Sequence, residues 1–508
     1  MASISRRGFL GAAAASAAAF VPGAAGALTE KAPRKWDETV EYLIVGTGFA
    51  GLASAIEAHT LGMKNVVVIE KMAFPGGNSV INGGAVAAAG TDMQEKAGIK
   101  DSADLLYRDI LKAGGGIAHP DLARHIADES VENFYWLRDK IGVKFAAVTY
   151  HGGHSVKRSH SNTAHQGSGF IEPMLKVCEK YGIPIRMRTY LEALIEDEKG
   201  RVVGAKIREG YVFPKEKSGK VKYVRSKKGV MLACGGFAQN VKMRMSHDPR
   251  LTSAFGSTNH PGATGEGIQE AQFLGANTVH MDWIQLGPWT SPDEQGFGLC
   301  PLLTEPLVGY GPMVDPKTAK RFVMETGNRK VRADAIVAIG HPVVMYACEK
   351  NIMNQAVGKN LSEKMWAELQ KSGVVHKFAT LKELAAFYNI PYDALQAQNE
   401  KFNGYMKAMK DPDFNCKFFK DGVPNTEANG PFYGWRLWPR VHHCMGGLEI
   451  NNKAQVLDAR GNVIPGLYAA GEATGGVHGM VRLGTVAVAD CMIFGRTAAR
   501  TAKAYKPA

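Results

Sequence analysis

Paired cysteines are missing from this sequence of 508 residues. Its seven cysteines lie far apart, and neither a CxxC nor a CxxCH motif occurs. An odd, unclustered set argues against a disulfide framework, an iron–sulfur cluster, a zinc site and an attached c-type haem. We therefore predict no metal site in this chain.

Long apolar runs and clustered basic segments are also absent. No stretch of the sequence approaches the about 20 apolar residues of a membrane-spanning helix, so stable membrane insertion is not expected. The lysines are dispersed, and no basic run is interleaved with aromatic residues, which argues against nucleic acid binding. With 45% hydrophobic residues, 21% charged residues and 58 glycines, the composition indicates a globular protein rich in loops. The length predicts two or three domains.

The first residues resemble a twin-arginine export signal. The segment "SRRGFLG" at residues 5–11 precedes an Ala-rich stretch from Ala12 to Val21 and the small-residue site "AAGA" that ends at Ala27. Such signals export proteins that have already folded around a cofactor. We expect cleavage near Ala27 and a periplasmic location.

The charge balance is basic. The formal net charge of +13 falls to +11 when residues 1–27 are removed, because Arg6 and Arg7 are lost and no acid is. A basic surface favours anionic substrates or an acidic protein partner by long-range attraction. The alternative interpretation is that the surface is basic only for solubility, which accounts equally well for this net charge.

A glycine fingerprint follows the first apolar strand of the mature chain. The segment "EYLIVGTGFAGLASAIEAHTLGMKNVVVIEK" reads as strand, turn, helix and strand, with Gly46, Gly48 and Gly51 at the turn. The first two glycines let the backbone approach a pyrophosphate, and the third lets the helix pack on the strand. Glu70 ends the second strand, where an acidic residue binds a ribose hydroxyl. This order of elements predicts dinucleotide binding.

Further glycine-rich loops favour FAD over a nicotinamide cofactor. They occupy residues 76–90, 228–240, 262–276 and 466–479. A nicotinamide enzyme needs one fingerprint, whereas a flavin held along its length needs N-terminal and C-terminal loops together. Besides the fingerprint and Glu70, the predicted cofactor-binding residues are Lys71, Gly77, Asn78, Ser79, Gly83, Gly84, Ala233, Gly235, Thr264, Gly265, Gly471, Glu472, Leu483 and Val486.

The pattern changes between His280 and about Pro439. Aromatic residues, prolines and amphipathic segments such as "SEKMWAELQKSG" and "LKELAAFYNI" replace the rhythm of apolar strands and glycine turns. We predict an α/β fold in which a Rossmann-like FAD-binding domain is interrupted by a smaller α+β capping domain. The predicted boundaries are 1–27 for the signal, 37–280 and 438–508 for the FAD-binding domain, and 281–437 for the cap.

The assembled motifs resemble one family. They are "GTGFAGLASAIEA", "EKMAFPGGNS", "TGEGIQEA", "RFVMETGNR", "HHCMGG" and "AAGEATGGVHGMVRLG". Together they are similar to exported fumarate reductase-like flavoproteins, which include flavocytochrome c fumarate reductase and urocanate reductase and are related to succinate dehydrogenase flavoprotein subunits. The resemblance implies an FAD-dependent oxidoreductase acting on CH–CH bonds. In such enzymes reduced flavin gives hydride to one alkene carbon of an unsaturated acid and an arginine gives a proton to the other.

The resemblance also implies roles for individual residues. Arg329 falls at the position of the proton-donating arginine, with Arg332 as a nearby second candidate. His442 and Arg482 match the pair that binds the substrate carboxylate. Thr304 and Glu305 match a Thr-Glu pair that helps to bind the second carboxylate of the substrate in fumarate reductases, so both are predicted substrate contacts, and Glu305 is also a predicted catalytic residue.

Two departures from the family pattern narrow the substrate. Gly287 stands where fumarate reductases have a histidine for the second carboxylate, and Val308 stands where a proton-relay arginine is expected. Trp289, a predicted substrate contact, and Phe297 lie nearby in the sequence. We expect a monocarboxylic 2-enoate with an apolar or aromatic tail, such as an acrylate, methacrylate or cinnamate. Fumarate reduction and a non-catalytic flavin subunit for electron transfer are the alternatives.

The electron source is expected outside the chain. Succinate dehydrogenase-type flavoproteins attach FAD through a histidine in the loop after the second strand, and residues 76–90 contain none, so FAD is predicted to bind non-covalently. Without a haem motif of its own, an exported reductase needs a separate donor. We expect a small, acidic c-type cytochrome.

Overall fold

A six-stranded sheet forms the centre of the larger lobe in the computed structural model, which describes residues 30–151 and 153–505. The predicted export signal lies outside the described residues. The strand order is β21-β22-β12-β3-β4-β8, and every neighbouring pair is parallel except β21 with β22. The strands are β3 (Tyr42–Val45), β4 (Val66–Ile69), β8 (Ile185–Arg186), β12 (Val230–Leu232), β21 (Gln455–Leu457) and β22 (Val463–Ala469).

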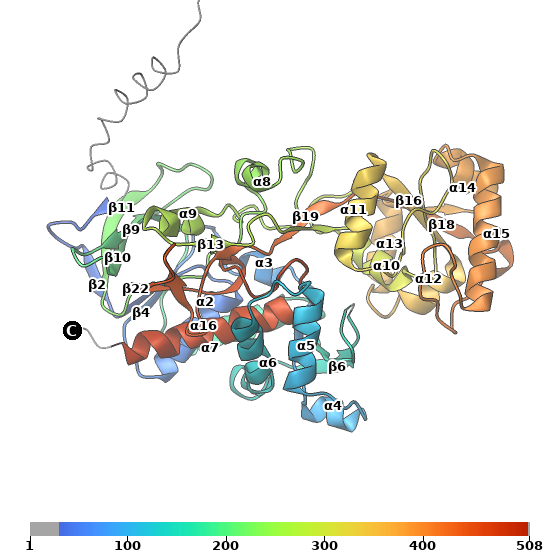
Figure 1. Ribbon diagram of the computed structural model, residues 1–508. Helices are drawn as coiled ribbons and strands as arrows, with labels where there is room; N and C mark the ends of the chain where they lie inside the picture. Colours follow the sequence, from blue (N-terminus) through green and yellow to red (C-terminus); the bar gives the residue numbers. More distant parts are fainter. Residues whose placement is uncertain (1–29, 152, 506–508) are drawn as a thin grey trace, which may run out of the picture.

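Two long helices pack together against this sheet (Figure 1). Helix α2 (Phe49–Thr60) follows β3 through the glycine turn, and α16 (Val486–Ala504) lies beside it. A side chain at Gly495 would overlap the carbonyl oxygen of Ala50, so this glycine sets how closely the two helices approach. The predicted order of strand, glycine turn, helix and strand is therefore confirmed. In the described part of the chain, no helix combines the length and the apolar character needed to cross a bilayer.

Two other sheets and three longer helices also belong to this lobe. A five-stranded sheet has the order β1-β9-β10-β11-β2, and a three-stranded sheet has the order β5-β7-β6. The first consists of β1 (Glu30–Lys31), β9 (Thr189–Glu196), β10 (Val202–Glu209), β11 (Lys220–Ser226) and β2 (Glu38–Val40), and the second of β5 (Ala85–Ala87), β7 (Ser159–Asn162) and β6 (Phe145–Thr149). The helices are α5 (Ala103–Ala113), α6 (Pro120–Tyr135) and α7 (Ser168–Lys180).

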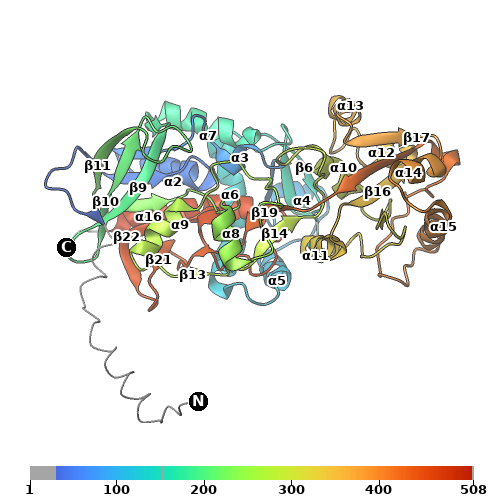
Figure 2. The same ribbon diagram turned by 90° about the horizontal axis from the view of Figure 1, so that it is seen from above.

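The second lobe is built around a four-stranded antiparallel sheet, which lies at the right in Figures 1 and 2. Its order is β15-β16-β18-β17, with β15 (Met313–Val314), β16 (Val343–Cys348), β17 (Val375–Phe378) and β18 (Phe432–Leu437). The surrounding helices are α10 (Cys300–Leu307), α11 (Arg329–Ile339), α12 (Glu349–Gln355), α13 (Glu363–Lys371), α14 (Leu381–Phe387) and α15 (Tyr392–Ala408). Helices α13 and α14 coincide with the two amphipathic segments that the sequence indicated.

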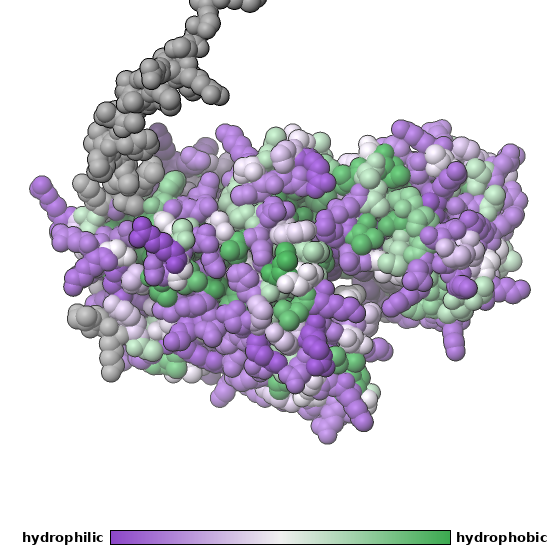
Figure 3. Space-filling view, viewed as in Figure 1, coloured by the Kyte–Doolittle hydropathy of each residue, from purple (hydrophilic) through white to green (hydrophobic). Residues whose placement is uncertain are grey.

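An antiparallel pair of strands joins the lobes. Strand β14 (Ile284–Gly287) leads out of the first lobe and β19 (Arg440–Cys444) leads back into it. Apolar side chains of residues 300–437 form clusters of their own, although Ala333 of α11 packs into the core of the first lobe. The domain boundaries at 281 and 437 stay predictions. The surface is hollowed where the lobes meet, and hydrophilic residues cover much of the rest of the face in Figure 3.

Candidate active site

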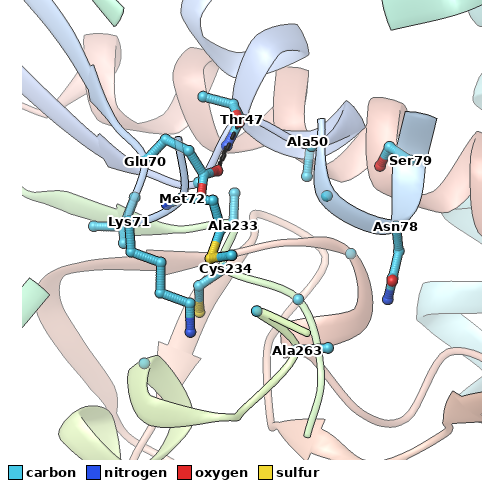
Figure 4. Close-up of a pocket in the computed structure, with 18 of the residues that line it drawn as sticks. Thr47, Ala50, Glu70, Lys71, Met72, Asn78, Ser79, Ala233, Cys234 and Ala263 are labelled. Atoms are coloured by element: carbon cyan, nitrogen blue, oxygen red, sulfur yellow. Dashed lines mark hydrogen bonds between the residues drawn. The ribbon is translucent and has the colours of Figure 1, made fainter. Parts of the chain in front are cut away.

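A cleft with an empty volume of about 940 Å³ opens where four parallel strands end (Figure 4). Its walls include the residues that directly follow β3, β4, β12 and β22. Ligands of open α/β sheets bind at this edge. The predicted cofactor residues that line the cleft are Gly46, Gly48, Glu70, Lys71, Gly77, Asn78, Ser79, Ala233, Gly235, Gly471 and Glu472.

The carboxylate of Glu70 is fixed at the cleft by its neighbours. One oxygen accepts hydrogen bonds from Thr47 Oγ1 (2.6 Å) and Thr47 N (3.2 Å), and the other accepts one from Met72 N (2.9 Å). The residue is only 9% exposed, so these bonds compensate for the water that the carboxylate loses. These bonds hold Glu70 at the cleft, where the fingerprint predicts that it binds a ribose hydroxyl.

Close backbone packing explains the glycines at the start of α2. A side chain at Gly46 would overlap the carbonyl oxygen of Ala233, and one at Gly51 would overlap the carbonyl oxygen of Gly46. Gly46 also has φ +109°, which favours glycine. Ser79 Oγ accepts a hydrogen bond from Phe49 N (3.0 Å), which ties the loop after β4 to the start of the helix.

Several predicted cofactor residues do not line this cleft. Gly51 serves helix packing, as described, and Val486 is buried at the start of α16. Thr264 Oγ1 contacts Lys71 Nζ (2.5 Å). Cofactor binding stays a prediction for the residues outside the cleft lining, which are Gly51, Gly83, Gly84, Thr264, Gly265, Leu483 and Val486. Motif matching cannot separate residues that shape a loop from residues that face its ligand.

The predicted carboxylate-binding pair is brought together by the structure. His442 is the extra residue of a bulge in β19, because Gln285 pairs with His443 and the next residue, Leu286, pairs with Val441. Bulges re-aim side chains next to active sites. The imidazole Nε2 lies 3.2 Å from Arg482 Nη2, and Nδ1 lies 2.8 Å from Thr258 Oγ1.

Burial makes this pair unusual electrostatically. It lowers the pKa of His442 well below its ordinary value, and the nearby charges of Arg482 and Arg329 act in the same direction. Burial likewise lowers the pKa of Arg482 to about 9, again reinforced by Arg329. The imidazole is therefore neutral at pH 7. Among the described residues, Arg482 Nε is buried without a hydrogen-bond partner.

A second group of charges comes from the other lobe. Asn328 caps α11 through a hydrogen bond from Val331 N (3.0 Å), so Arg329 and Arg332 lie one helical turn apart on the same side. Arg332 Nη2 donates to both carboxylate oxygens of Glu305 on α10, at 3.1 and 2.9 Å. Arg332 is 2% exposed, whereas the Glu305 side chain keeps 37% of its surface exposed.

These charges act on one another. Burial raises the pKa of Glu305, but the positive charges of Arg332 and Arg329 outweigh this effect and hold that pKa below its ordinary value. Burial lowers the pKa of Arg329, opposed by Glu305 and reinforced by Arg332. Arg329 Nη1 has no hydrogen-bond partner within the described residues. With three guanidinium groups and one paired carboxylate, the site favours a bound anion.

Trp289 links the two groups. Its ring lies edge-on to His442 with centroids 4.8 Å apart, and Arg329 Cζ lies 5.6 Å from the centre of the indole ring. Arginine over a tryptophan face is a favourable cation–π arrangement. Phe297 packs against the same indole at 5.7 Å. Arg329, His442, Arg482 and Trp289 therefore lie around one small region between the lobes.

The hydroxyl of Thr304 makes its contacts within the second lobe. The residue is fully buried, and its hydroxyl oxygen accepts a hydrogen bond from Trp435 Nε1 (3.0 Å) within the core of the second lobe. On helix α10 the neighbouring residue Glu305 points toward Arg332 instead. Consecutive helical residues face directions about 100° apart, so Thr304 and Glu305 point differently, and a contact between Thr304 and the substrate stays a prediction.

Sequence comparison assigns the fold to a family. Residues 41–488 match the family model described as FAD binding domain. The chain belongs to this FAD-binding family. As predicted, it is therefore an FAD-dependent oxidoreductase with the fumarate reductase-like fold.

Several members of this FAD-binding family are similar over nearly the whole chain. The acrylate reductase flavoprotein subunit of Shewanella woodyi is 43% identical, over 98% of both chains. The fumarate reductase (cytochrome) of Shewanella frigidimarina is 34% identical and covers 92% of this chain and 78% of its own. The open conformation of a flavocytochrome c3 fumarate reductase superimposes with a TM-score of 0.76 at 29% identity, over 99% of this chain and 81% of that one.

The cleft of this FAD-binding protein fits its cofactor. The glycines at the start of α2 leave bare backbone there, and the N-cap residue Gly48 has no side chain to cover the helix terminus. Such a terminus favours the pyrophosphate of FAD, and the fixed carboxylate of Glu70 suits its ribose. At the far end, Glu472 accepts a hydrogen bond from Cys444 N (2.9 Å), which connects the cleft to the strand that bears His442.

Sequence reasoning missed two polar residues of the site. Thr258, in the segment "GSTNHPG", contacts His442 as described above. His151 is half-buried, and its pKa falls to about 4 through loss of solvation and the charge of Arg329. Its Nδ1 has no partner in the part of the chain that the structure describes. The polar, glycine-containing loops around both residues were the only signal in the sequence.

Proposed function

We propose that this protein reduces the carbon–carbon double bond of a monocarboxylic 2-enoate. The observation that carries the proposal is the convergence of Arg329, from the second lobe, with His442 and Arg482, from the first. Three groups suited to one small anion meet there, and the partnerless Nε of Arg482 and Nη1 of Arg329 leave donors available for it. The names of relatives that act on acrylate, fumarate and urocanate support this substrate class.

The carboxylate of the substrate binds first in this scheme. Arg482 offers a planar set of N–H donors that matches a carboxylate, and His442 fixes the position of that guanidinium through the 3.2 Å contact. Binding then holds the alkene in one orientation, which removes much of the entropic barrier to reaction. The positive charge at the carboxylate also draws electron density away from the double bond.

Protonation is the task of Arg329. Reduced FAD supplies the hydride, and the adjacent carbon then needs a proton. Arginine is normally a very weak acid, but burial lowers the pKa of Arg329 and brings it closer to releasing a proton. Glu305 returns a proton to Arg329. Its carboxylate is close enough to raise the pKa of Arg329, and its side chain is partly exposed to water, from which a proton can be taken.

We further propose a periplasmic enzyme that receives electrons from a separate c-type cytochrome. The twin-arginine pattern at residues 5–11 and the charge of +13 in the full sequence support this part. The relative named fumarate reductase (cytochrome) extends beyond the region shared with this chain, which covers 78% of it. A basic flavoprotein suits a brief encounter with an acidic cytochrome.

The reaction is tested with FAD-loaded protein and reduced methyl viologen. Acrylate, methacrylate, cinnamate and fumarate are compared by kcat/KM. We expect acrylate and methacrylate to be favoured over fumarate, and Arg329→Lys to lower kcat by about 10²- to 10⁴-fold, the usual contribution of a general acid. The matched control is Lys330→Ala, the next residue on α11, whose ammonium pairs with Asp334 at the surface.

Two outcomes would reject the proposal. A fumarate preference by a wide margin would show that the site binds dicarboxylates. Full activity in Arg329→Lys would show that another group supplies the proton.

A further inference from the structure

The indole of Trp289 fills the space beside the catalytic groups. A side chain at Gly287, two residues earlier, would bring its Cβ to 2.7 Å from Trp289 Cη2, which is shorter than any real contact. The ring therefore lies directly over the backbone of β14 and replaces whatever side chain position 287 could hold. It is only 3% exposed.

The turn that carries Trp289 is locked in place. Thr290 Oγ1 donates to the carbonyl oxygen of Trp438 (2.7 Å) and lies 3.1 Å from that of Gly287, and Trp438 N donates to the carbonyl oxygen of Thr290 (2.9 Å). These bonds tie the segment after β14 to the segment before β19. They hold the backbone that carries the indole, and the ring itself is packed against His442 and Phe297.

The position of the ring decides how long a substrate can be. A 2-enoate whose carboxylate is held by Arg482 and whose alkene is protonated by Arg329 must lie against the indole, since His442 and Arg329 each contact that ring. Phe297 packs edge-on against the same indole and also lies near the His442 ring, with centroids 6.2 Å apart, so the three rings form one aromatic cluster. A substituent beyond the alkene would have to occupy the volume of the indole. Displacing a packed side chain costs free energy, because protein interiors are close-packed.

We propose that Trp289 is the specificity-determining residue that restricts this enzyme to short 2-enoates of the acrylate and methacrylate type. This rests on the proposed function and narrows it. Cinnamate, with its phenyl ring, and fumarate, with its second carboxylate, are excluded by the same side chain. Fumarate is disfavoured further because an indole carries no positive charge to pair with the second carboxylate of fumarate.

The test measures ratios of kcat/KM in FAD-loaded protein with reduced methyl viologen. In the natural protein, acrylate should exceed cinnamate by at least about 100-fold, because one misplaced methylene already costs about 10- to 200-fold. Trp289→Ala should raise the cinnamate-to-acrylate ratio at least about 100-fold, since the cavity left by an indole accepts a phenyl ring. Trp289→Phe should give an intermediate ratio. The matched control is Trp283→Ala, a half-buried tryptophan whose ring lies under Lys330 instead.

Ratios within one variant do not depend on how much of it folds, and the comparison in the natural protein needs no variant. Equal use of cinnamate and acrylate by the natural protein would overturn the proposal. An unchanged ratio in soluble Trp289→Phe or Trp289→Ala would also overturn it. If no enoate is reduced by the natural protein, the proposed function itself fails, which is a different result.

Discussion

Single residues in this site are suited to the reaction because burial shifts their pKa values. His442 is neutral and Arg482 has a pKa of about 9, since both have lost water without gaining an acidic partner. Such an arrangement costs stability in the absence of substrate. An anion that enters between these groups compensates for the lost solvation, so binding energy is available where the reaction occurs.

The buried carboxyl of Glu472 makes the stability of the folded protein depend on pH. Burial raises the pKa of its carboxyl to about 7, from an ordinary value near 4.5. The folded protein thus holds this proton more tightly than the unfolded chain, so stability is fully present below about pH 4.5 and falls as the pH rises toward 7. We predict that Glu472→Gln removes this decline and raises the free energy of unfolding at pH 8 by roughly 2 kcal/mol.

The measurement is thermal unfolding of flavin-free protein between pH 5 and pH 8. Glutamine keeps an oxygen that can accept from Cys444 N, so the hydrogen bond survives in the variant. Glu70→Gln is the matched control, because Glu70 lines the same cleft. Parallel pH curves for the natural protein and Glu472→Gln would contradict the assignment.

At the scale of elements, helix α11 holds two functional arginines from one N-terminus. Its cap at Asn328 fixes where the helix begins, so Arg329 and Arg332 share a side and reach Trp289 and Glu305. Val308 stands where the family resemblance implies a relay arginine. Arg332 anchors Glu305 from the other helix, which supplies a guanidinium partner without one at position 308.

We predict that Arg332→Met separates the first turnover from the later ones. The first turnover uses the proton that Arg329 already carries, whereas each later one needs Glu305 to return a proton. Without the hydrogen bonds at 2.9 and 3.1 Å, the carboxylate loses its orientation. The steady-state kcat should fall about 10- to 100-fold with little change in KM, which is less than the loss of the acid itself.

Stopped-flow reoxidation of the reduced flavin by one equivalent of acrylate measures the first turnover. Its rate should match that of the natural protein in Arg332→Met. Lys330→Met serves as the control on the same helix. If the first turnover slows as much as the steady state, Arg332 supports the shape of α11 and not the return of protons.

The elements that the sequence predicted are those defined by local patterns. Gly46, Gly48 and Gly51 indicated the turn before α2 because their role depends on backbone within a few residues. Thr304 and Trp289 are both predicted substrate contacts, and in the structure Thr304 is buried against Trp435 whereas Trp289 lies beside His442 and Arg329. Which face of α10 points inward depends on Trp435, about 130 residues away, and no local signal records this.

At the scale of the whole molecule, the site exists only when both lobes meet. Arg329 and Glu305 come from the second lobe, His442 and Arg482 from the first, and Trp289 from the segment that joins them. The amino-acid sequence indicated the members through motifs, but their convergence depends on how β14 and β19 set one lobe on the other. Closure between lobes also excludes water, which strengthens each charge interaction in the site.

The charge of the molecule leads to the last prediction, which concerns electron delivery. The full sequence carries a net charge of +13, and the chain without residues 1–27 carries +11. Attraction between such a surface and an acidic cytochrome acts over distances of about 10 Å at 0.1 M salt and weakens as salt is added.

The rate constant for oxidation of a reduced, acidic c-type cytochrome, with acrylate as acceptor, should therefore fall at least about 10-fold between low and physiological salt. Reduced methyl viologen is a small cation that needs no docking surface, so its rate should change little over the same range. A basic cytochrome of similar potential is the matched control and should react slowly at every salt concentration. Equal rates with both cytochromes would mean that the surface charge does not select the donor.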